Sequence, residues 1–330
     1  MPLWEPSDTL EMIIIGDVMM HSRQLQHDHR TFLKEISPAL KAADFAVANL
    51  EFPLAGPPYS GYPNFSTPDW YPEYLSECGI NVFLLANNHI LDKGGAGFSR
   101  SLKVYDRMAA EGSAEYTGAA ASLERFEEVN PLIVSHRGIS VALVNFTYGT
   151  NGGSSSRWPA VARMKKEEIG AQIQRAKERE ADFIVALPHW GVEYELEHSL
   201  EQEELAKWLV SQGVDAIVGA HPHVVQDTMY IKDVPVIYSV GNAVSNMSVK
   251  NTRLELAVTI RFVRRGKGTP VMTEPELRWM WCTLPGKLGG SYATIFTDEW
   301  TGRRDEWLDP SDYDNMIRHL NERHCQTGSH

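Results

Sequence analysis

The sequence contains few cysteines and no long apolar run. The three cysteines, Cys78, Cys282 and Cys325, are odd in number and widely spaced, so they form neither a metal-type pair nor an evident disulfide framework. No apolar stretch approaches the roughly 20 residues that a helix needs to span a bilayer. Residues 1–10 also lack the basic start and apolar stretch of a signal peptide. A trimmed secreted protein would look the same, so the compartment stays open.

Basic residues are in the minority. The chain has 31 Lys and Arg against 43 Asp and Glu, which gives a net charge of −12 at pH 7. Binding to the phosphate backbone of DNA or RNA needs a basic stripe, so we expect no nucleic-acid partner. The same charge repels a polyanionic polymer at long range unless bound metal reverses the local field.

Six short apolar runs alternate with segments of helical periodicity. Each run is rich in Val, Ile, Leu or Phe and closes on polar or Gly residues, as buried strands do. Apolar residues at helical spacing favour helices at 98–111, 165–180 and 201–212. This alternation predicts a layered α/β fold. The six runs are 12–15, 45–48, 82–86, 183–187, 216–218 and 234–238.

Two hairpin patterns interrupt the alternation. Apolar segments at 132–135 and 139–146 flank a glycine turn, and those at 254–263 and 271–281 flank a basic turn. Antiparallel hairpins beside strand–helix units predict mixed sheets.

The chain shows no internal repeat, low-complexity tract or long linker. We therefore interpret residues 1–330 as a single domain with a core at 12–263 and a hairpin-and-helix extension at 264–330. Within the extension, a helix is expected to start near Asp309-Pro310 and to end in a polar tail.

Each of the six runs leads into residue types that bind metal or phosphate. Open α/β sheets place ligand sites outside the carboxyl ends of their strands, so these side chains are expected to converge. Carboxylates, imidazoles and amide oxygens together suit one or two divalent ions such as Mn, Zn or Fe. In chain order the residues are Asp17 with His21 and Arg23, Asn49 and Glu51, Asn87-Asn88-His89 with Asp92, His189, His221-Pro222-His223, and Ser239 with Gly241 and Asn242.

Several of these residues have ordinary explanations when taken singly. Asp17 alone reads as a turn or helix cap, and His189 alone as a core histidine. His221-Pro222-His223 is the most specific piece, because residues two apart on an extended segment face the same way. The run 193–204, with six Glu and one His, is interpreted as a solvated helix and loop face.

The combined pattern from about residue 12 to 246 resembles the CapA (PgsA) capsule-synthesis family. That family is similar to the calcineurin-like metallophosphoesterases, whose fold is two mixed β-sheets sandwiched between helices (αββα). The resemblance implies a link to capsule or poly-γ-glutamate biosynthesis and a place at the cell envelope. The motifs that carry it are Gly16-Asp17 with His21, Asn49-Leu50-Glu51, Asn87-Asn88-His89 with Asp92, His189-Trp190-Gly191, His221-Pro222-His223 and Tyr238-Ser239-Val240-Gly241-Asn242, together with Thr147–Asn151-Gly152.

The resemblance also implies a role for each position. Asp17 and His223 would bind one metal, with His21 as a further ligand. Glu51 would bridge to a second metal held by three more residues. These three are Asn88, His189 and His221.

Four more residues complete the predicted site. His89 would act on the leaving group as an acid or charge stabiliser, and Asp92 would orient it. Arg23 is a candidate contact to an anionic substrate, because a guanidinium matches an oxyanion with two bonds. Asn242 is predicted to bind substrate as well.

Three positions depart from the usual superfamily pattern. Asp17 and His21 are four residues apart rather than two, Glu51 replaces an aspartate, and Ile90 replaces an acid after His89. Two hypotheses therefore stand. The favoured one is a divalent-metal-dependent hydrolase, above all a phosphoesterase, acting on an anionic small molecule or polymer. The alternative is a non-catalytic metal-containing accessory protein that binds an anionic polymer in a membrane-associated synthesis or export complex.

Overall fold

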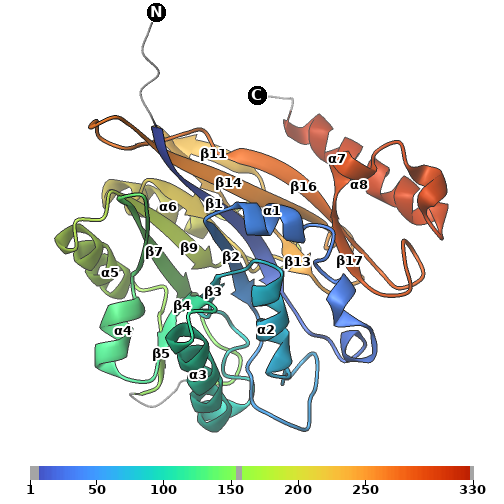
Figure 1. Ribbon diagram of the computed structural model, residues 1–330, viewed down its shortest axis with the longest axis horizontal. Helices are drawn as coiled ribbons and strands as arrows, with labels where there is room; N and C mark the ends of the chain where they lie inside the picture. The colour runs from blue at the N-terminus through green and yellow to red at the C-terminus, as the bar shows by residue number, and fades with distance from the viewer. Residues whose placement is uncertain (1–6, 154–157, 328–330) are drawn as a thin grey trace, which may run out of the picture.

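The computed structural model describes residues 7–153 and 158–327 (Figure 1). Within these residues the strands form a nine-stranded sheet, a six-stranded sheet and a small two-stranded one. The nine strands are β1 (Ser7–Val18), β2 (Phe45–Leu50), β3 (Val82–Leu84), β4 (Glu115–Thr117), β13 (Asn242–Val244), β14 (Leu254–Arg265), β15 (Val271–Met272), β16 (Glu276–Thr283) and β17 (Ala293–Phe296). Their order is β17-β16-β14-β1-β2-β3-β4, with β13 beside β1 and β15 beside β14.

The six-stranded sheet is also mixed. Its strands are β6 (Leu132–His136), β7 (Ile139–Thr147), β9 (Phe183–His189), β10 (Ala216–Val218), β11 (Thr228–Ile231) and β12 (Val234–Ile237). Their order is β11-β12-β10-β9-β7-β6, in which β7, β9, β10 and β12 run parallel. The two-stranded sheet pairs β5 (Ala119–Ala120) with β8 (Ala160–Val161).

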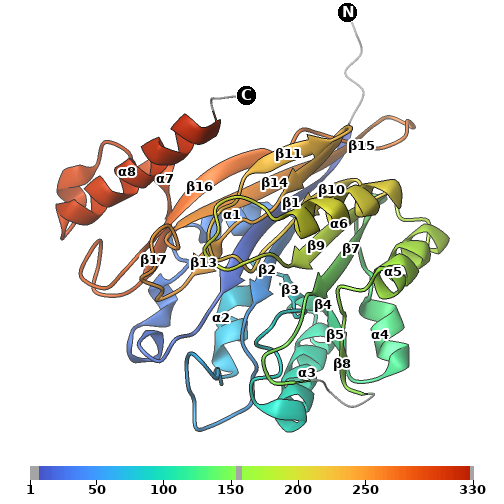
Figure 2. The same cartoon turned by 180° about the vertical axis from the view of Figure 1, so that it is seen from behind.

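The two large sheets pack face to face and helices cover both outer surfaces. Ile14 and Val47 of the nine-stranded sheet share one buried cluster with Val141 and Val185 of the other. In front of the nine-stranded sheet lie α1 (Ser37–Ala42), α2 (Trp70–Glu77) and α3 (Gly94–Ala110). Seen from behind, α4 (Leu123–Val129), α5 (Lys166–Glu178) and α6 (Leu200–Ser211) cover the six-stranded sheet (Figure 2). This arrangement confirms the predicted αββα fold class.

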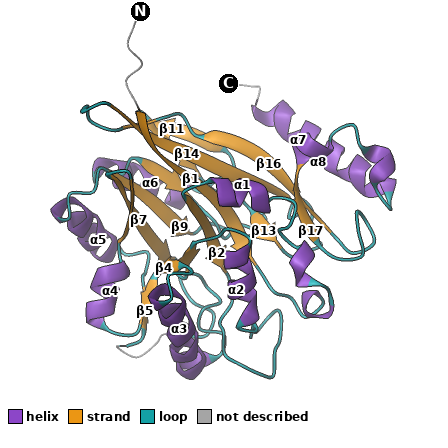
Figure 3. Cartoon of the chain, in the orientation of Figure 1, coloured by secondary structure: helices purple, strands orange, loops and turns teal. Residues whose placement is uncertain are grey.

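The C-terminal residues extend the nine-stranded sheet at its edge. There β16 pairs with β14 and β17 pairs with β16, while α7 (Thr297–Trp300) and α8 (Pro310–Thr327) lie beside them (Figure 3). Trp281 and Ile295 of the sheet share a buried cluster with Met316 and Leu320 of α8. The helix starts at Pro310, as the sequence predicts. The division of the chain at residue 263 stays a prediction.

Both predicted hairpins form. The β6–β7 turn consists of Arg137 and Gly138, which have φ of 47° and 74°. Two consecutive positive φ values are typical of a type I′ turn, whose twist matches that of the flanking strands. The six apolar runs are all strands, although β3 ends at Leu84, two residues before the expected end. No helix among the described residues has the length and apolarity required to span a membrane.

Position 16 has no room for a side chain, because the backbone at Gly241 lies too close to Gly16. A Cβ at this position would lie 1.9 Å from the Gly241 carbonyl oxygen, and the same carbonyl accepts the Asp17 N–H at 3.1 Å. Because both partners are backbone, Gly16→Ala is expected to lower the free energy of unfolding by about 3 kcal/mol. Gly95→Ala is the control, since a Cβ on Gly95 in α3 meets nothing within 4 Å. Urea midpoints measure both, and an unchanged midpoint for Gly16→Ala would contradict the packing argument.

Candidate metal centre

The strand register brings the ends of three strands together. Asp17 in β1 is paired with Asn49 in β2 on one side and with Asn242 in β13 on the other. In the second sheet, His189 at the end of β9 bridges to Ala220, just after β10. Carboxylates from the nine-stranded sheet therefore meet imidazoles from the six-stranded sheet at one edge.

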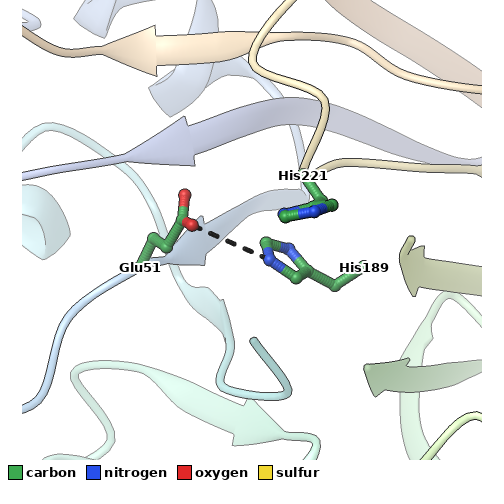
Figure 4. A group of neighbouring side chains, drawn as sticks. All are labelled: Glu51, His189 and His221. Carbon is green, nitrogen blue, oxygen red and sulfur yellow. Dashed lines mark ion pairs between the residues drawn. The ribbon is translucent and has the colours of Figure 1, made fainter. Parts of the chain in front are cut away.

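Two groups of ligand-type side chains share Glu51. Glu51, His189 and His221 form one group, and Asp17, Glu51 and His223 form the other. Within each group the possible ligand atoms lie within 4.8 Å of one another. Figure 4 shows the first group, in which His189 Nε2 lies 3.7 Å from Glu51 Oε1. Glu51 thus occupies the shared position that a bridging ligand needs.

The second group is held together by equally short contacts. His223 Nδ1 lies 3.4 Å from Asp17 Oδ2 and 3.8 Å from Glu51 Oε2. In the first group, Asn88 Oδ1 lies 2.9 Å from His189 Nε2, so the amide predicted as a ligand stands beside that imidazole.

Buried atoms without partners show that these residues fit a cation. Both carboxylate oxygens of Glu51 and Nδ1 of His221 are buried and have no hydrogen-bond partner among the described residues. An unpaired carboxylate in the interior costs several kcal/mol, which a divalent cation would offset. The mixed oxygen and nitrogen donors suit Mn, Zn or Fe, and the cluster contains no Cys.

Burial and neighbouring charges shift the pKa values of the cluster residues in different directions. Burial and the charge of Asp17 raise the pKa of Glu51 well above its usual value. Burial alone would lower the pKa of His223, but the Glu51 and Asp17 carboxylates outweigh it and raise that pKa to about 9. Burial and neighbouring imidazoles lower the pKa of His221 to about 3 and that of His189 well below 6.5. His189 and His221 are therefore neutral, which leaves a lone pair available for a metal.

Metal binding is expected to release protons and to weaken in acid. Without metal, His223 holds a proton below pH about 9, and a ligand must lose its proton to bind. Affinity should therefore rise with pH up to about 9, by about tenfold per pH unit for each proton released. Calorimetry of Mn binding in buffers of different ionisation heat counts these protons. His136→Gln, which alters a histidine outside the cluster, should release the same number, and zero release by the wild type would contradict the assignment.

Two asparagines that the sequence placed in the converging set, without an individual role, form hydrogen bonds with the cluster residues. Asn49 Nδ2 donates to Asp17 Oδ1 at 2.7 Å and lies 3.3 Å from His189 Nδ1. Asn87 Nδ2 donates to Asn49 Oδ1 at 3.2 Å, and Asn87 Oδ1 accepts the His89 N–H at 3.1 Å. One chain of buried amides thus links the first ligand strand to His89.

The His221-Pro222-His223 segment brings both imidazoles to the cluster, but not through the extended backbone that the sequence reasoning assumed. Both histidines have left-handed backbone, with φ of 102° at His221 and 58° at His223, so the segment is a turn and not an extended strand. Such conformations cost of order 1–3 kcal/mol each and persist where surrounding contacts hold them. One such contact is the His221 N–H, which donates to Asp17 Oδ2 at 3.1 Å. The turn places one histidine in each of the two groups that share Glu51, and both belong to a third group as well.

The sequence relationships agree with this geometry. Residues 11–247 match the family described as bacterial capsule synthesis protein PGA_cap. The chain belongs to this family. It is 30% identical over 282 residues to "Capsule biosynthesis protein CapA" of Bacillus anthracis, covering 81% of the chain and 66% of the relative. It is 26% identical over 279 residues to "PGA biosynthesis protein CapA" of Bacillus subtilis, covering 79% and 70%. The predicted CapA resemblance is confirmed, although the chain spans less than two thirds of the B. anthracis relative's length.

Some solved structures share a similar arrangement at low sequence identity. The calcineurin-like phosphoesterase YfkN from Bacillus subtilis aligns with 83% of this chain and 91% of its own, at 13% identity and a TM-score of 0.49. NAD nucleotidase (NadN) from Haemophilus influenzae aligns with 82% of this chain and 52% of its own, at 12% identity and a TM-score of 0.47.

In this PGA_cap member, His89 lies beside the ligand groups without belonging to either. Its Nδ1 pairs with Asp92 Oδ2 at 2.7 Å, and Asp92 Oδ2 also accepts the Phe65 N–H at 2.8 Å. The other nitrogen, Nε2, lies 3.9 Å from Glu51 Oε1. Asp92 therefore orients His89 toward the cluster, and both side chains are buried. Their catalytic role stays a prediction.

His21 and Arg23 lie further from the centre. His21 Nδ1 is 3.0 Å from Gln24 Oε1, so a metal would have to use Nε2. Burial lowers the pKa of His21 to about 4, and the charges of His223 and His89 add to this effect. Arg23 is exposed at the start of the 3-10 helix η1 (Gln24–Gln26) and forms no ion pair with a described residue. Both predicted roles stay predictions.

Asn242 contacts a ligand residue directly. Its side chain is fully buried, with Oδ1 3.0 Å from His223 Nδ1, and Nδ2 donates to the Thr252 carbonyl at 2.9 Å. The structure therefore makes Asn242 a positioning residue for His223. The predicted contact with substrate stays a prediction.

Glu193 is exposed, as the sequence predicts for its segment, but it also lies beside the cluster. It was assigned with its neighbours to a solvated face, and it is exposed, yet its carboxylate forms a third ligand-type group with His221 and His223. The loop after β9 folds back over the cluster, because the Tyr194 N–H donates to the Pro222 carbonyl at 2.8 Å. The sequence did hold one signal for this role, because Glu193 follows His189 by only four residues and so lies close to the end of a predicted strand.

Proposed function

We propose that this chain is a divalent-metal-dependent phosphoesterase of capsule or poly-γ-glutamate biosynthesis. The observation that carries the proposal is Glu51, a buried carboxylate that two ligand groups share and whose oxygens have no hydrogen-bond partner among the described residues. When bound, one or two divalent ions supply a Lewis acid for the phosphoryl oxygens and lower the pKa of water.

The residues of the chain have distinct tasks in this proposal. Asp17 and His223 hold one ion, while Asn88, His189 and His221 hold the second, and Glu51 serves both. Asn49 and Asn242 fix the second group by hydrogen bonds to Asp17 and His223.

His89 moves a proton at the leaving group. Its Nδ1 is held by Asp92, so Nε2 is the nitrogen that faces the cluster. In the protonated state it donates to the leaving oxygen of the ester, which then departs as an alcohol. Asp92 stabilises the imidazolium and keeps the ring in this orientation.

The setting of the reaction is part of the proposal. The names of the relatives support a role in capsule synthesis. The cell envelope and a membrane-associated synthesis complex are proposed as its setting. The substrate would be an anionic small molecule or polymer, and no nucleic acid is expected as a partner.

The test combines metal analysis with an assay. Protein purified without chelator is analysed for Mn, Zn and Fe, and then assayed on a broad phosphoester panel with each metal added. Metal retention with turnover supports the proposal. Two bound metals without turnover would favour the alternative, a metal-containing accessory protein that binds an anionic polymer.

A further inference from the structure

Three exposed tyrosines from three different loops each face a different histidine of the centre. The Tyr148 ring lies 4.5 Å from the His221 ring, centroid to centroid. Tyr194 lies 6.2 Å from His223, and Tyr62 lies 6.4 Å from His89. Their exposed fractions are 45%, 38% and 70%. We call Tyr62, Tyr148 and Tyr194 the tyrosine rim.

Two tyrosines of the rim are hydrogen-bonded through their backbone to the segments that carry the ligand histidines. The Tyr148 N–H donates to the His189 carbonyl at 3.0 Å, and the Tyr194 N–H donates to the Pro222 carbonyl at 2.8 Å. Tyr148 is also nearly parallel to His189, with 12° between the ring planes. These two rings therefore hold a defined position relative to the centre.

The far end of the Tyr194 loop is fixed as well. The His198 N–H donates to Asp227 Oδ1 at 2.9 Å, and its ring stacks on Tyr238 at 3.9 Å. Gln226 Nε2 donates to the carbonyls of Glu195 and Glu197, both at 3.1 Å. A loop held this way presents its aromatic side chain with little loss of entropy on binding.

The charges around the centre do not favour a long polyanion. The electrostatic influences on Glu51, His221 and His223 come from carboxylates and other histidines. Among the described residues, no Lys or Arg forms an ion pair with Asp17, Glu51 or Glu193. Beyond the metal ligands, the tyrosine rim therefore offers aromatic surface around the centre, which binds flat, weakly charged groups.

We propose that the tyrosine rim is a subsite for a ring in the alcohol part of a phosphomonoester. This inference rests on the proposed phosphoesterase activity and names its substrate class. A sugar ring and a nucleobase share the required chemistry, namely a flat face that packs on a tyrosine and polar edges that reach its hydroxyl. A flexible acyl or peptide chain offers no such face.

Two six-carbon alkyl esters, one with a ring and one with a flexible chain, test the rim. Cyclohexyl phosphate and n-hexyl phosphate both have six carbons and alkyl leaving groups of similar reactivity. With Mn-loaded full chain, kcat/KM is expected to favour the cyclohexyl ester. Tyr148→Leu and Tyr194→Leu should each lower that preference by about 2- to 10-fold, the range for one aromatic contact. Tyr230→Leu, which alters an equally exposed tyrosine on β11, is the control.

The outcomes separate this inference from the proposed function. Equal kcat/KM for the two esters, or an unchanged preference in both leucine variants with wild-type metal content, would overturn the rim subsite while hydrolysis stands. If neither ester is hydrolysed, calorimetry with cyclohexylphosphonate and n-hexylphosphonate decides the subsite by binding alone. Glucose 6-phosphate and uridine 5′-monophosphate then identify the ring: a rim-dependent preference for the first indicates a sugar, and for the second a nucleobase.

Discussion

Replacing Glu51 with glutamine is expected to remove metal from both ligand groups and to abolish phosphoester hydrolysis. Glu51 is the carboxylate common to the two groups, and its oxygens have no hydrogen-bond partner among the described residues that could compensate. A neutral amide of the same size cannot balance two cations. We expect kcat/KM to fall by about three orders of magnitude or more, because a metal Lewis acid supplies several kcal/mol. Elemental analysis and steady-state kinetics on the same preparation measure both effects.

Two further variants sharpen this experiment. Glu51→Asp keeps the negative charge on a side chain one methylene shorter, and should keep both metal and activity. Glu255→Gln is the matched control, since Glu255 is another fully buried glutamate whose oxygens lack partners among the described residues, yet it belongs to none of the ligand groups. It should retain metal and turnover. A Glu51→Gln protein that still carried two metals per chain would show that Glu51 is no shared ligand.

Replacing His89 with alanine should lower kcat while leaving the metal content unchanged. His89 lies outside the ligand groups, and its Nε2 faces the cluster because Asp92 holds Nδ1. Loss of a general acid typically costs about 10²- to 10⁴-fold in rate. The loss should be small for p-nitrophenyl phosphate, whose leaving group needs no proton, and large for an alkyl phosphate. Loss of metal in this variant would show His89 to be a ligand.

Asp92 provides an independent check on the same pair. Asp92→Asn should lower kcat on alkyl phosphates less than His89→Ala does, since the asparagine still contacts the ring but stabilises the imidazolium poorly. Combined with His89→Ala it should add nothing, because Asp92 acts through His89. A further loss in the double variant would mean that Asp92 has a separate task, such as fixing the Phe65 backbone.

The sequence was sufficient to predict the elements whose signals are local. Buried strands show as short apolar runs, and the β6–β7 hairpin follows from Arg137-Gly138, which adopts the two positive φ values of its turn. The gathering of Asp17, Glu51 and the late histidines followed from one rule, that parallel strands of an open sheet end at the same edge.

Features that depend on register or on loop contacts were beyond sequence reasoning. Asn242 reaches His223 because β13 lies directly beside β1, a pairing that no pattern in the sequence signals. Glu193 reaches the centre through the Tyr194–Pro222 backbone contact, whereas the composition of its segment indicates only solvent exposure. The placement of His221 and His223 in the cluster depends on left-handed backbone, which is unusual for histidine.

The division of ligands between two sheets has a consequence for the folding of the chain. Asp17 and Glu51 lie at the ends of strands of one sheet and the three histidines at or just after the ends of strands of the other, so the set exists only in the native state. An ion bound there would connect the two sheets and stabilise the folded state. At an ion concentration of one hundred times Kd, the free energy of unfolding would rise by about 2.7 kcal/mol. Metal starvation would then reduce the amount of folded protein in the cell as well as the activity of each molecule.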